Sequence, residues 1–114
     1  MPWEVEYTDE FESWWDGLVE AEQESVDASV QLLKKHGPDL PFPHSSQIAG
    51  SKSGKLRELR IQHRGRPYRV LYGFDRRRTA LLLVGGDKTG NNRWYEQHVP
   101  RADALFRTHL VLLK

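Results

Sequence analysis

The chain has 114 residues and a formal net charge of +1, with 38% hydrophobic and 29% charged residues. This composition excludes an intrinsically disordered chain, and the length predicts one domain that spans residues 1–114. The absence of cysteine excludes a disulfide scaffold and a thiolate metal centre, and the longest apolar run, residues 80–84, is too short to cross a bilayer.

The charges are distributed unevenly along the chain. Residues 1–27 contain ten acidic residues and no Lys or Arg, whereas residues 52–78 contain ten basic residues and two acidic ones. Such a separation produces a strongly polar surface even though the total charge is small. The alternative is that the acidic helices simply lie against a basic sheet edge within the molecule.

The first half of the chain predicts one strand followed by two helices. Residues 3–7 alternate apolar and acidic side chains, which is typical of a strand; because the chain starts with it, we expect no signal peptide and a cytoplasmic location. A capping-box pattern predicts a short helix over residues 10–15, and apolar residues at helical spacing predict a longer helix over residues 20–36. The loop over residues 37–54 is rich in Pro, Ser and Gly, and its length is typical of functional or mobile loops.

The second half predicts three consecutive strands and a C-terminal helix. The strands are expected over residues 55–62, 67–74 and 79–86, followed by a helical turn over residues 93–98 and a new helix that starts at Pro100. The element order is therefore β-α-α-β-β-β-α. We predict an α+β domain in which a small, mostly antiparallel sheet carries its helices on one face and leaves the other face cationic.

The polarity of the first two of these strands predicts their register. If Arg60 pairs with Arg69, the apolar residues of one strand face apolar residues of the other, whereas a shift by one residue mixes the two kinds. Two arginines directly across from each other repel, and Glu58 on the same face offsets only part of that repulsion. An arginine in the middle of a strand is costly unless an anion meets it, so we predict an anion-binding site here.

Four side chains are the candidate catalytic residues. The guanidinium groups of Arg60 and Arg69 and the ammonium group of Lys88 would stabilise the charge that develops on a scissile phosphate. Tyr95 would stack on a base or transfer a proton, for which its ordinary pKa near 10 would need to be lowered. The alternative for Tyr95 is a core position at the start of the last helix.

A second set of residues is expected to bind RNA. It consists of four basic side chains and one aromatic ring that can stack on a base, namely Lys52, Lys55, Arg57, Arg76 and Trp94. A solvated basic turn is the simpler interpretation for Arg76, and a core position is the simpler one for Trp94. The five histidines lack the spacing of metal ligands, so we expect neither a metal ion nor another cofactor.

Five sequence segments resemble one family of proteins. They are LRELR at 56–60, YRVLYGF at 68–74, LLLVGGDKTG at 81–90, WYE at 94–96 and VPRADALF at 99–106. In these segments the chain resembles the RelE/ParE superfamily of bacterial type II toxins, in its phage-derived, HigB-like branch. The resemblance implies a RelE-like fold and a toxin that enters the ribosome and cleaves mRNA there, acting as an endoribonuclease that uses the ribose 2′-hydroxyl as nucleophile.

The resemblance also implies partners and residue roles. The expected partner is a cognate antitoxin with a helix-turn-helix, and operator DNA would be bound only through the complex of the two; no membrane is implied. Arg69 matches the arginine that the superfamily uses at the scissile phosphate, Lys88 matches a cation after the last central strand, and Tyr95 falls near a C-terminal aromatic residue of active members. The chain lacks an equivalent of a C-terminal catalytic histidine, since His98 follows the aromatic pair.

Two other functions remain open at this point. A ParE-like toxin would share the fold but inhibit DNA gyrase by protein contact. A non-toxic relative would only pair with an antitoxin, and the lack of an obvious general base in the sequence is consistent with that alternative.

Overall fold

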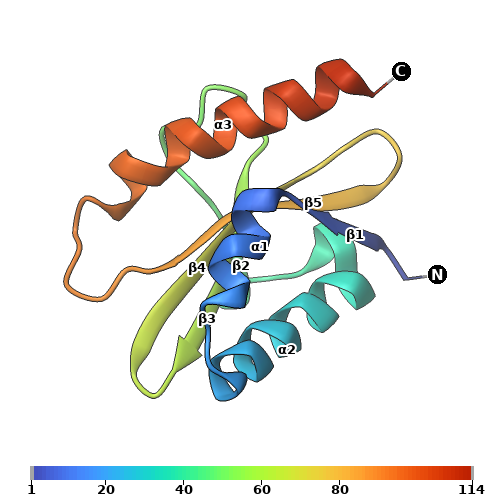
Figure 1. The fold of residues 1–114 in the computed structure, drawn as a ribbon. Coiled ribbons are helices and arrows are strands. Elements are labelled where there is room, and N and C mark those ends of the chain that lie inside the picture. The colour runs from blue at the N-terminus through green and yellow to red at the C-terminus, as the bar shows by residue number, and fades with distance from the viewer. Residues whose placement is uncertain (1, 114) are drawn as a thin grey trace.

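A five-stranded sheet forms the centre of the molecule, with helices on both of its sides (Figure 1). The structure is a computed structural model, and it describes residues 2–113. In chain order the elements are β1 (Glu4–Tyr7), α1 (Asp9–Asp16), α2 (Glu20–His36), a 3₁₀ turn η1 (Gly37–Asp39), β2 (Ser45–Gln47), β3 (Arg57–His63), β4 (Arg66–Phe74), β5 (Thr79–Asp87) and α3 (Trp94–Leu112). The predicted α+β class is confirmed, and the structure adds β2 inside the long loop.

The strands lie in the order β1-β5-β4-β3-β2. The pairs formed by β2, β3, β4 and β5 are antiparallel, as expected for consecutive strands, whereas β1 runs parallel to β5 at one edge of the sheet. α1 and α2 carry the chain from β1 at this edge to β2 at the other. β2 has only three residues, which is too short for an alternating pattern to be recognised in the sequence.

The predicted register of β3 and β4 is confirmed. Arg60 pairs with Arg69 and Leu59 pairs with Val70. Because side chains alternate between the two faces of a strand, this register places both arginines on one face and both apolar residues on the other.

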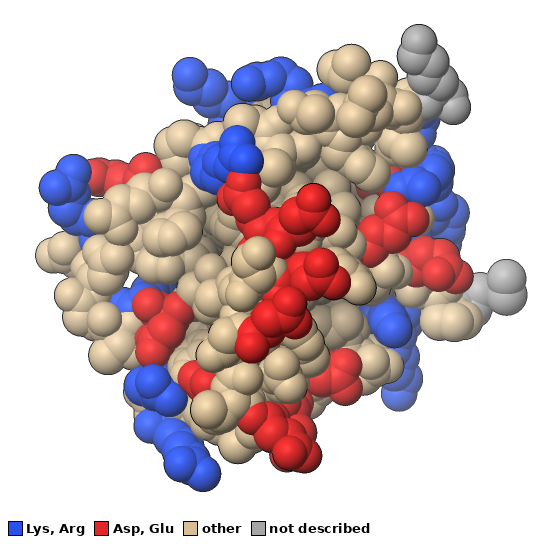
Figure 2. All heavy atoms as spheres, in the orientation of Figure 1, with Lys and Arg blue, Asp and Glu red and all other residues tan. Residues whose placement is uncertain are grey.

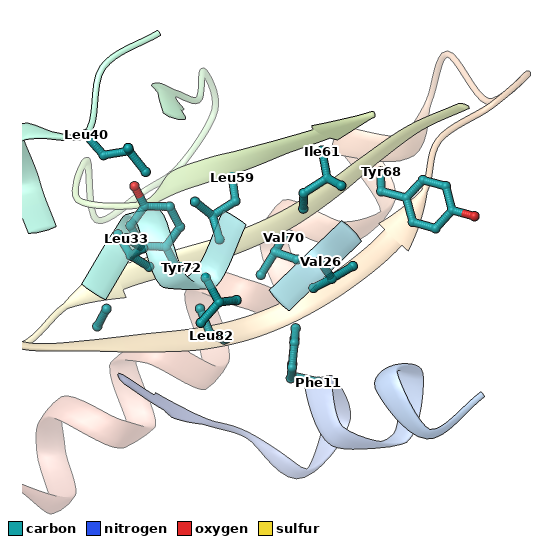
Figure 3. Packing of buried hydrophobic residues seen from close by; sticks show 12 residues of the cluster. Phe11, Val26, Leu33, Leu40, Leu59, Ile61, Tyr68, Val70, Tyr72 and Leu82 are labelled. Carbon is teal, nitrogen blue, oxygen red and sulfur yellow. The ribbon is translucent and has the colours of Figure 1, made fainter. Parts of the chain in front are cut away.

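α1 and α2 cover the face that carries the apolar residues. Phe11 of α1 and Val26 and Leu33 of α2 pack against Leu59 and Val70, and each of the five exposes 5% or less of its surface (Figure 3). Burial of side chains of this size contributes roughly 1.5–3 kcal/mol each. This cluster holds α1 and α2 against the sheet.

α3 covers the opposite face, where a second apolar cluster forms. Trp94, Ala102 and Phe106 of α3 pack with Leu71 of β4 and Leu83 of β5. The prediction that all helices lie on one face and leave the other face cationic is therefore wrong. Strands that are covered on both faces lack the alternation of apolar and polar residues, and the unbroken apolar run of β5 has this property.

α3 is one continuous helix and is not divided at Pro100 as predicted. Proline has no N–H group to donate to the preceding turn, so one hydrogen bond of the helix is missing there. Trp94 before the proline and Ala102 and Phe106 after it belong to the same buried cluster. Packing on the sheet therefore keeps both parts of the helix in line.

The acidic residues gather over α1 and α2, as Figure 2 shows for that side of the molecule. Some of this charge is neutralised internally, because Glu22 of α2 lies 3.5 Å from Arg66 of β4 and Glu10 of α1 pairs with Arg101 of α3. The alternative of intramolecular pairing thus accounts for part of the charge separation in the sequence. No helix within residues 2–113 combines the length and the apolar composition needed to cross a membrane.

Candidate anion-binding site

The predicted arginine pair lies on the α3 face of the sheet, at the end where α3 begins. Glu58 and Arg60 are two residues apart in β3 and point to the same face, and the register places Arg69 of β4 directly opposite Arg60. Tyr95 comes from the first turn of α3, and Lys88 lies in the loop between β5 and α3. We call these five residues the anion site.

Glu58 is the centre of the anion site. Its carboxylate lies 3.3 Å from Nη1 of Arg60 and 3.4 Å from Nε of Arg69. It also accepts 2.5 Å hydrogen bonds from the hydroxyl groups of Tyr95 and Ser46. The Glu58 side chain exposes only 5% of its surface. A single buried carboxylate therefore serves two arginines that would otherwise repel each other.

Arg69 is buried rather than presented on an open surface, with 5% of its surface exposed. Its Nη1 group donates a hydrogen bond to the carbonyl oxygen of Tyr68 at 3.0 Å, and its Nε group donates one to the hydroxyl oxygen of Tyr95 at 3.2 Å. The prediction that a mid-strand arginine must meet an anion is satisfied here by Glu58. An external anion is thus not needed to stabilise the fold, although Arg60 still exposes 30% of its side chain.

Tyr95 connects the acidic and basic groups of the anion site. Burial, together with the hydrogen bond to Glu58, raises the pKa of Tyr95 above its usual value, so its hydroxyl group stays protonated at neutral pH. The lowered pKa that the sequence analysis required for proton transfer by Tyr95 is therefore not found, and the hydroxyl group donates a hydrogen bond to Glu58. The ammonium group of Lys88 lies over its ring, 5.7 Å from the ring centre.

The anion site has a surplus of positive charge, because its five residues include three cations and one carboxylate. Beside it, an open groove with a volume of about 770 Å³ follows the part of β3 that extends beyond β2. Arg60 and Arg69 line this groove together with His44 and Gln62, and Ser29 of α2 lines its other side. The groove therefore gives a ligand access to Arg60, while Arg69 borders it as a buried residue.

The structure does not bring the predicted RNA-binding residues to the anion site. Arg57 lies on the opposite face of β3 from Arg60, because the two residues are three positions apart in a strand, and its Nε group donates to the hydroxyl oxygen of Ser45 at 3.2 Å. Arg76 lies in the turn between β4 and β5, at the other end of these strands, where it binds the carbonyl oxygen of Leu113.

Lys52 of the long loop lies beside α3. The main-chain N–H group of Lys52 donates to the carboxylate of Asp103 at 2.8 Å, which ties the loop to the middle of α3. Burial raises the pKa of Asp103, but the hydrogen bonds that its carboxylate accepts lower the pKa by more, so the pKa lies below its usual value. Lys52 is thus held at α3 and not at the anion site. Lys55 is exposed just before β3.

Trp94 is a core residue, and its expected role in stacking on RNA bases is wrong. It exposes 2% of its surface and belongs to the cluster between α3 and the sheet. The ring of His98 stacks on it with the ring centres 4.3 Å apart, and His98 Nδ1 lies 2.8 Å from the carbonyl oxygen of Trp94. A core position at the start of the last helix was already the simpler interpretation of Trp94 in the sequence.

Sequence reasoning missed the central role of Glu58, which it treated only as a partial charge offset. The alternation of β3 contains the signal, since residues 58 and 60 share a face. Ser46 could not be recognised, because β2 shows no pattern in the sequence. The contact between Tyr95 and Glu58 depends on the path of the loop after β5, about which local patterns say little.

Comparison with known proteins identifies the family to which the chain belongs. A family model described as "Phage derived protein Gp49-like (DUF891)" matches residues 13–107. The chain is 35% identical over 101 residues to a protein of Mycobacterium tuberculosis named as toxin HigB2, a match that covers 87% of this chain and 50% of that protein. It is 39% identical over 93 residues to the protein named as toxin HigB3 of the same organism, with 81% and 80% of the two chains covered. The chain thus spans about half the length of HigB2.

Solved structures with the same fold have low sequence identity to this chain. An arginine double mutant of the toxin RelE from Escherichia coli, in its free state, superposes with a TM-score of 0.62 at 14% identity and covers 89% of this chain and 98% of that one. The toxin–antitoxin complex RelBE2 of Mycobacterium tuberculosis contains a chain that matches with a TM-score of 0.54 at 18% identity, with coverage of 76% and 99%. The fold is therefore RelE-like.

Proposed function

The chain belongs to the phage-derived Gp49-like family, and on this premise we propose that it is the toxin of a type II toxin–antitoxin system that cleaves mRNA on the ribosome. Its relatives are named as toxins, and its fold is that of RelE. The catalytic residues in this proposal are Arg60, Arg69, Lys88 and Tyr95, together with Glu58.

One observation carries the proposal: a carboxylate, a protonated phenol and three cations meet at one end of the sheet beside an open groove. RNA cleavage by the ribose 2′-hydroxyl needs these three kinds of group. It needs a base for the hydroxyl proton, an acid for the leaving oxygen and positive charge at the phosphate. Glu58 supplies the general base that was not evident in the sequence.

In the proposed reaction, the 2′-oxygen forms a bond to the adjacent phosphorus while the bond from phosphorus to the 5′-oxygen breaks. The products are a 2′,3′-cyclic phosphate and a 5′-hydroxyl group. Glu58 takes the proton of the 2′-hydroxyl, and Tyr95 gives its own proton to the departing 5′-oxygen. Their 2.5 Å hydrogen bond then returns a proton from Glu58 to Tyr95, so that both groups regain their starting states.

The cations act on the phosphate itself. Arg60, which is the more exposed of the two arginines, and Lys88 approach the phosphate oxygens first, while Arg69 is held in place by Tyr68 and Tyr95. Positive groups fixed where negative charge develops lower the barrier without needing to reorganise during the reaction. The ribosome would supply the orientation of the RNA.

The proposed partners are a cognate antitoxin and mRNA on the ribosome, which implies a cytoplasmic protein. The antitoxin proposal is supported by the toxin–antitoxin complex RelBE2, in which a chain of the same fold is present. A helix-turn-helix in the antitoxin and binding of operator DNA by the complex remain part of this proposal.

The test is expression of the chain in a bacterial host, followed by mapping of mRNA 5′ ends. We expect new transcript ends with the wild-type protein and their loss with Arg60→Gln and with Tyr95→Phe. Arg107→Gln is the matched control, because Arg107 is an exposed residue in the later part of α3 and the substitution removes the same charge. Purified variants are checked for folding by circular dichroism.

Other outcomes would contradict the proposal in distinct ways. Intact transcripts together with gyrase-dependent DNA damage would indicate a ParE-like inhibitor. Normal growth with intact transcripts would indicate a relative that only pairs with an antitoxin. Full cleavage by a folded Tyr95→Phe protein would remove Tyr95 from the mechanism.

A further inference from the structure

We propose that Phe42 forms a binding subsite for one nucleobase of a single-stranded RNA whose phosphate lies at Arg60. This inference rests on the proposed function, because it assumes that the ligand of the anion site is RNA. Phe42 lies in the loop between η1 and β2 and exposes 68% of its surface, although it is a large apolar residue. Nothing in the core of the protein requires an aromatic ring at this position.

The position of Phe42 is fixed by the backbone around it. The main-chain N–H groups of His44 and Ser45 both donate to the carbonyl oxygen of Pro41, at 2.9 and 3.1 Å, which closes a tight turn around Phe42. The carbonyl oxygen of His44 then accepts a hydrogen bond from the N–H group of Arg60 at 2.9 Å. The turn that carries the exposed ring is thus tied to β3, so little backbone conformational freedom has to be lost when a ligand binds.

Phe42 lies beside the anion site, on the side of Arg60. The guanidinium carbon of Arg60 lies 5.0 Å from the centre of the Phe42 ring, so the positive group and the aromatic surface are neighbours. Three cations lead toward this ring, namely Lys88 in the loop after β5, Arg69 of β4 and Arg60 of β3. The groove beside Arg60 and Arg69 runs along the same loop, where His44 lines it.

A phosphate-binding group beside an exposed aromatic ring is the arrangement that binds single-stranded nucleic acid. Cations hold the backbone, and the aromatic ring stacks on a base. Because every base has a flat π-face, the ring favours any base over an abasic nucleotide and favours purines through their larger stacking area. Duplex RNA keeps its bases stacked on one another, so the subsite selects unpaired nucleotides.

The test uses short single-stranded RNAs in which one base is 2-aminopurine, whose fluorescence is quenched when it stacks, and matched RNAs that are abasic at that position. We expect the wild-type protein to quench the fluorescence and to bind the base-containing RNA about tenfold more tightly than the abasic one. Phe42→Leu removes both the quenching and this preference, whereas Phe42→Trp restores them. Tyr7→Leu is the matched control, since Tyr7 is also an exposed aromatic residue, on the far strand β1, and this variant behaves as wild type.

Two results would overturn the subsite. One is equal affinity of the wild-type protein for base-containing and abasic RNA. The other is unchanged quenching by a folded Phe42→Leu protein. Either result would indicate that the exposed ring of Phe42 contacts another protein rather than a nucleobase. Failure of the proposed function is recognised separately, by intact transcripts in the expression experiment. Arg60→Gln weakens binding of both RNAs alike, which separates loss of the phosphate contact from loss of stacking.

Discussion

Arg69 and Glu58 form a buried ion pair whose contribution to stability can be measured directly. Their side chains expose 6% and 5% of their surface, and the Nε and Oε1 atoms lie 3.4 Å apart. At an effective dielectric constant near 20, unit charges at this distance attract by about 5 kcal/mol, much of which is offset by the loss of hydration of both groups. Removing one partner leaves the other charge buried without that compensation.

We therefore expect Arg69→Met and Glu58→Gln each to lower the free energy of unfolding by about 3 kcal/mol. The double variant should lose clearly less than the two single losses together, which corresponds to a coupling free energy of about 2 kcal/mol. The assay is urea unfolding of all four proteins, followed by the fluorescence of tryptophan, since Trp94 is buried next to Tyr95.

A second pair on the surface provides the control for this cycle. Arg93 and Glu96 lie 3.0 Å apart at the start of α3 but expose 72% and 70% of their side chains. Exposed pairs of this kind couple by about 0.5 kcal/mol or less. Additive losses for Arg69 and Glu58, with a coupling as small as that of the surface pair, would refute the view that the carboxylate compensates a buried charge.

Three further predictions concern stability. Burial raises the pKa of Asp75, but hydrogen bonds lower it more, to about 2, so Asp75 stabilises the folded protein by about 2 kcal/mol above pH 4 and loses this effect as the pH falls toward 2. The difference in unfolding free energy between wild type and Asp75→Asn should shrink accordingly over this range, and a difference that does not vary with pH would be contrary evidence. Gly86→Ala would place a Cβ atom 2.5 Å from Nε1 of Trp94, so we expect a loss of about 1–3 kcal/mol in urea unfolding and an altered near-ultraviolet circular dichroism spectrum. Asp103→Ala removes the acceptor of the Lys52 N–H group, and hydrogen exchange at Lys52 should become at least about tenfold faster; unchanged protection would show that the loop is held by other contacts.

The register of β3 and β4 could be predicted because both strands carry enough polarity to exclude the alternative. A shift by one residue would have placed Arg60 opposite Val70, so the sequence contains both the correct pairing and the reason to reject the other. The same alternation placed Glu58 on the face of Arg60, but its role as the shared partner of both arginines was not recognised. The alternation also places Arg57 on the opposite face, a conclusion that was not drawn.

The sequence contained evidence that helices cover both faces of the sheet, but this evidence was misinterpreted. The residues of β5 from Thr79 to Val84 are all buried, and a strand with one wet face would not have this composition. The interpretation of α3 as two pieces gave too much weight to Pro100. A proline lowers the stability of a helix, but a helix packed on a sheet derives most of its stability from that packing.

The remaining features depend on loops, whose paths local patterns do not determine. Tyr95 reaches Glu58 only because the loop after β5 returns the chain across the end of the sheet. Phe42 stands beside Arg60 only because the turn before β2 is bonded to β3. Both contacts join residues that are distant in the sequence, and neither residue belongs to a periodic pattern.

In the protein without a ligand, the carboxylate of Glu58 pairs with both arginines, as a bound phosphate group would. In the proposed reaction, a guest phosphate that draws the arginines toward itself would loosen them from this carboxylate, which would then be free to accept a proton. Entry of the substrate and activation of the base would then be a single event.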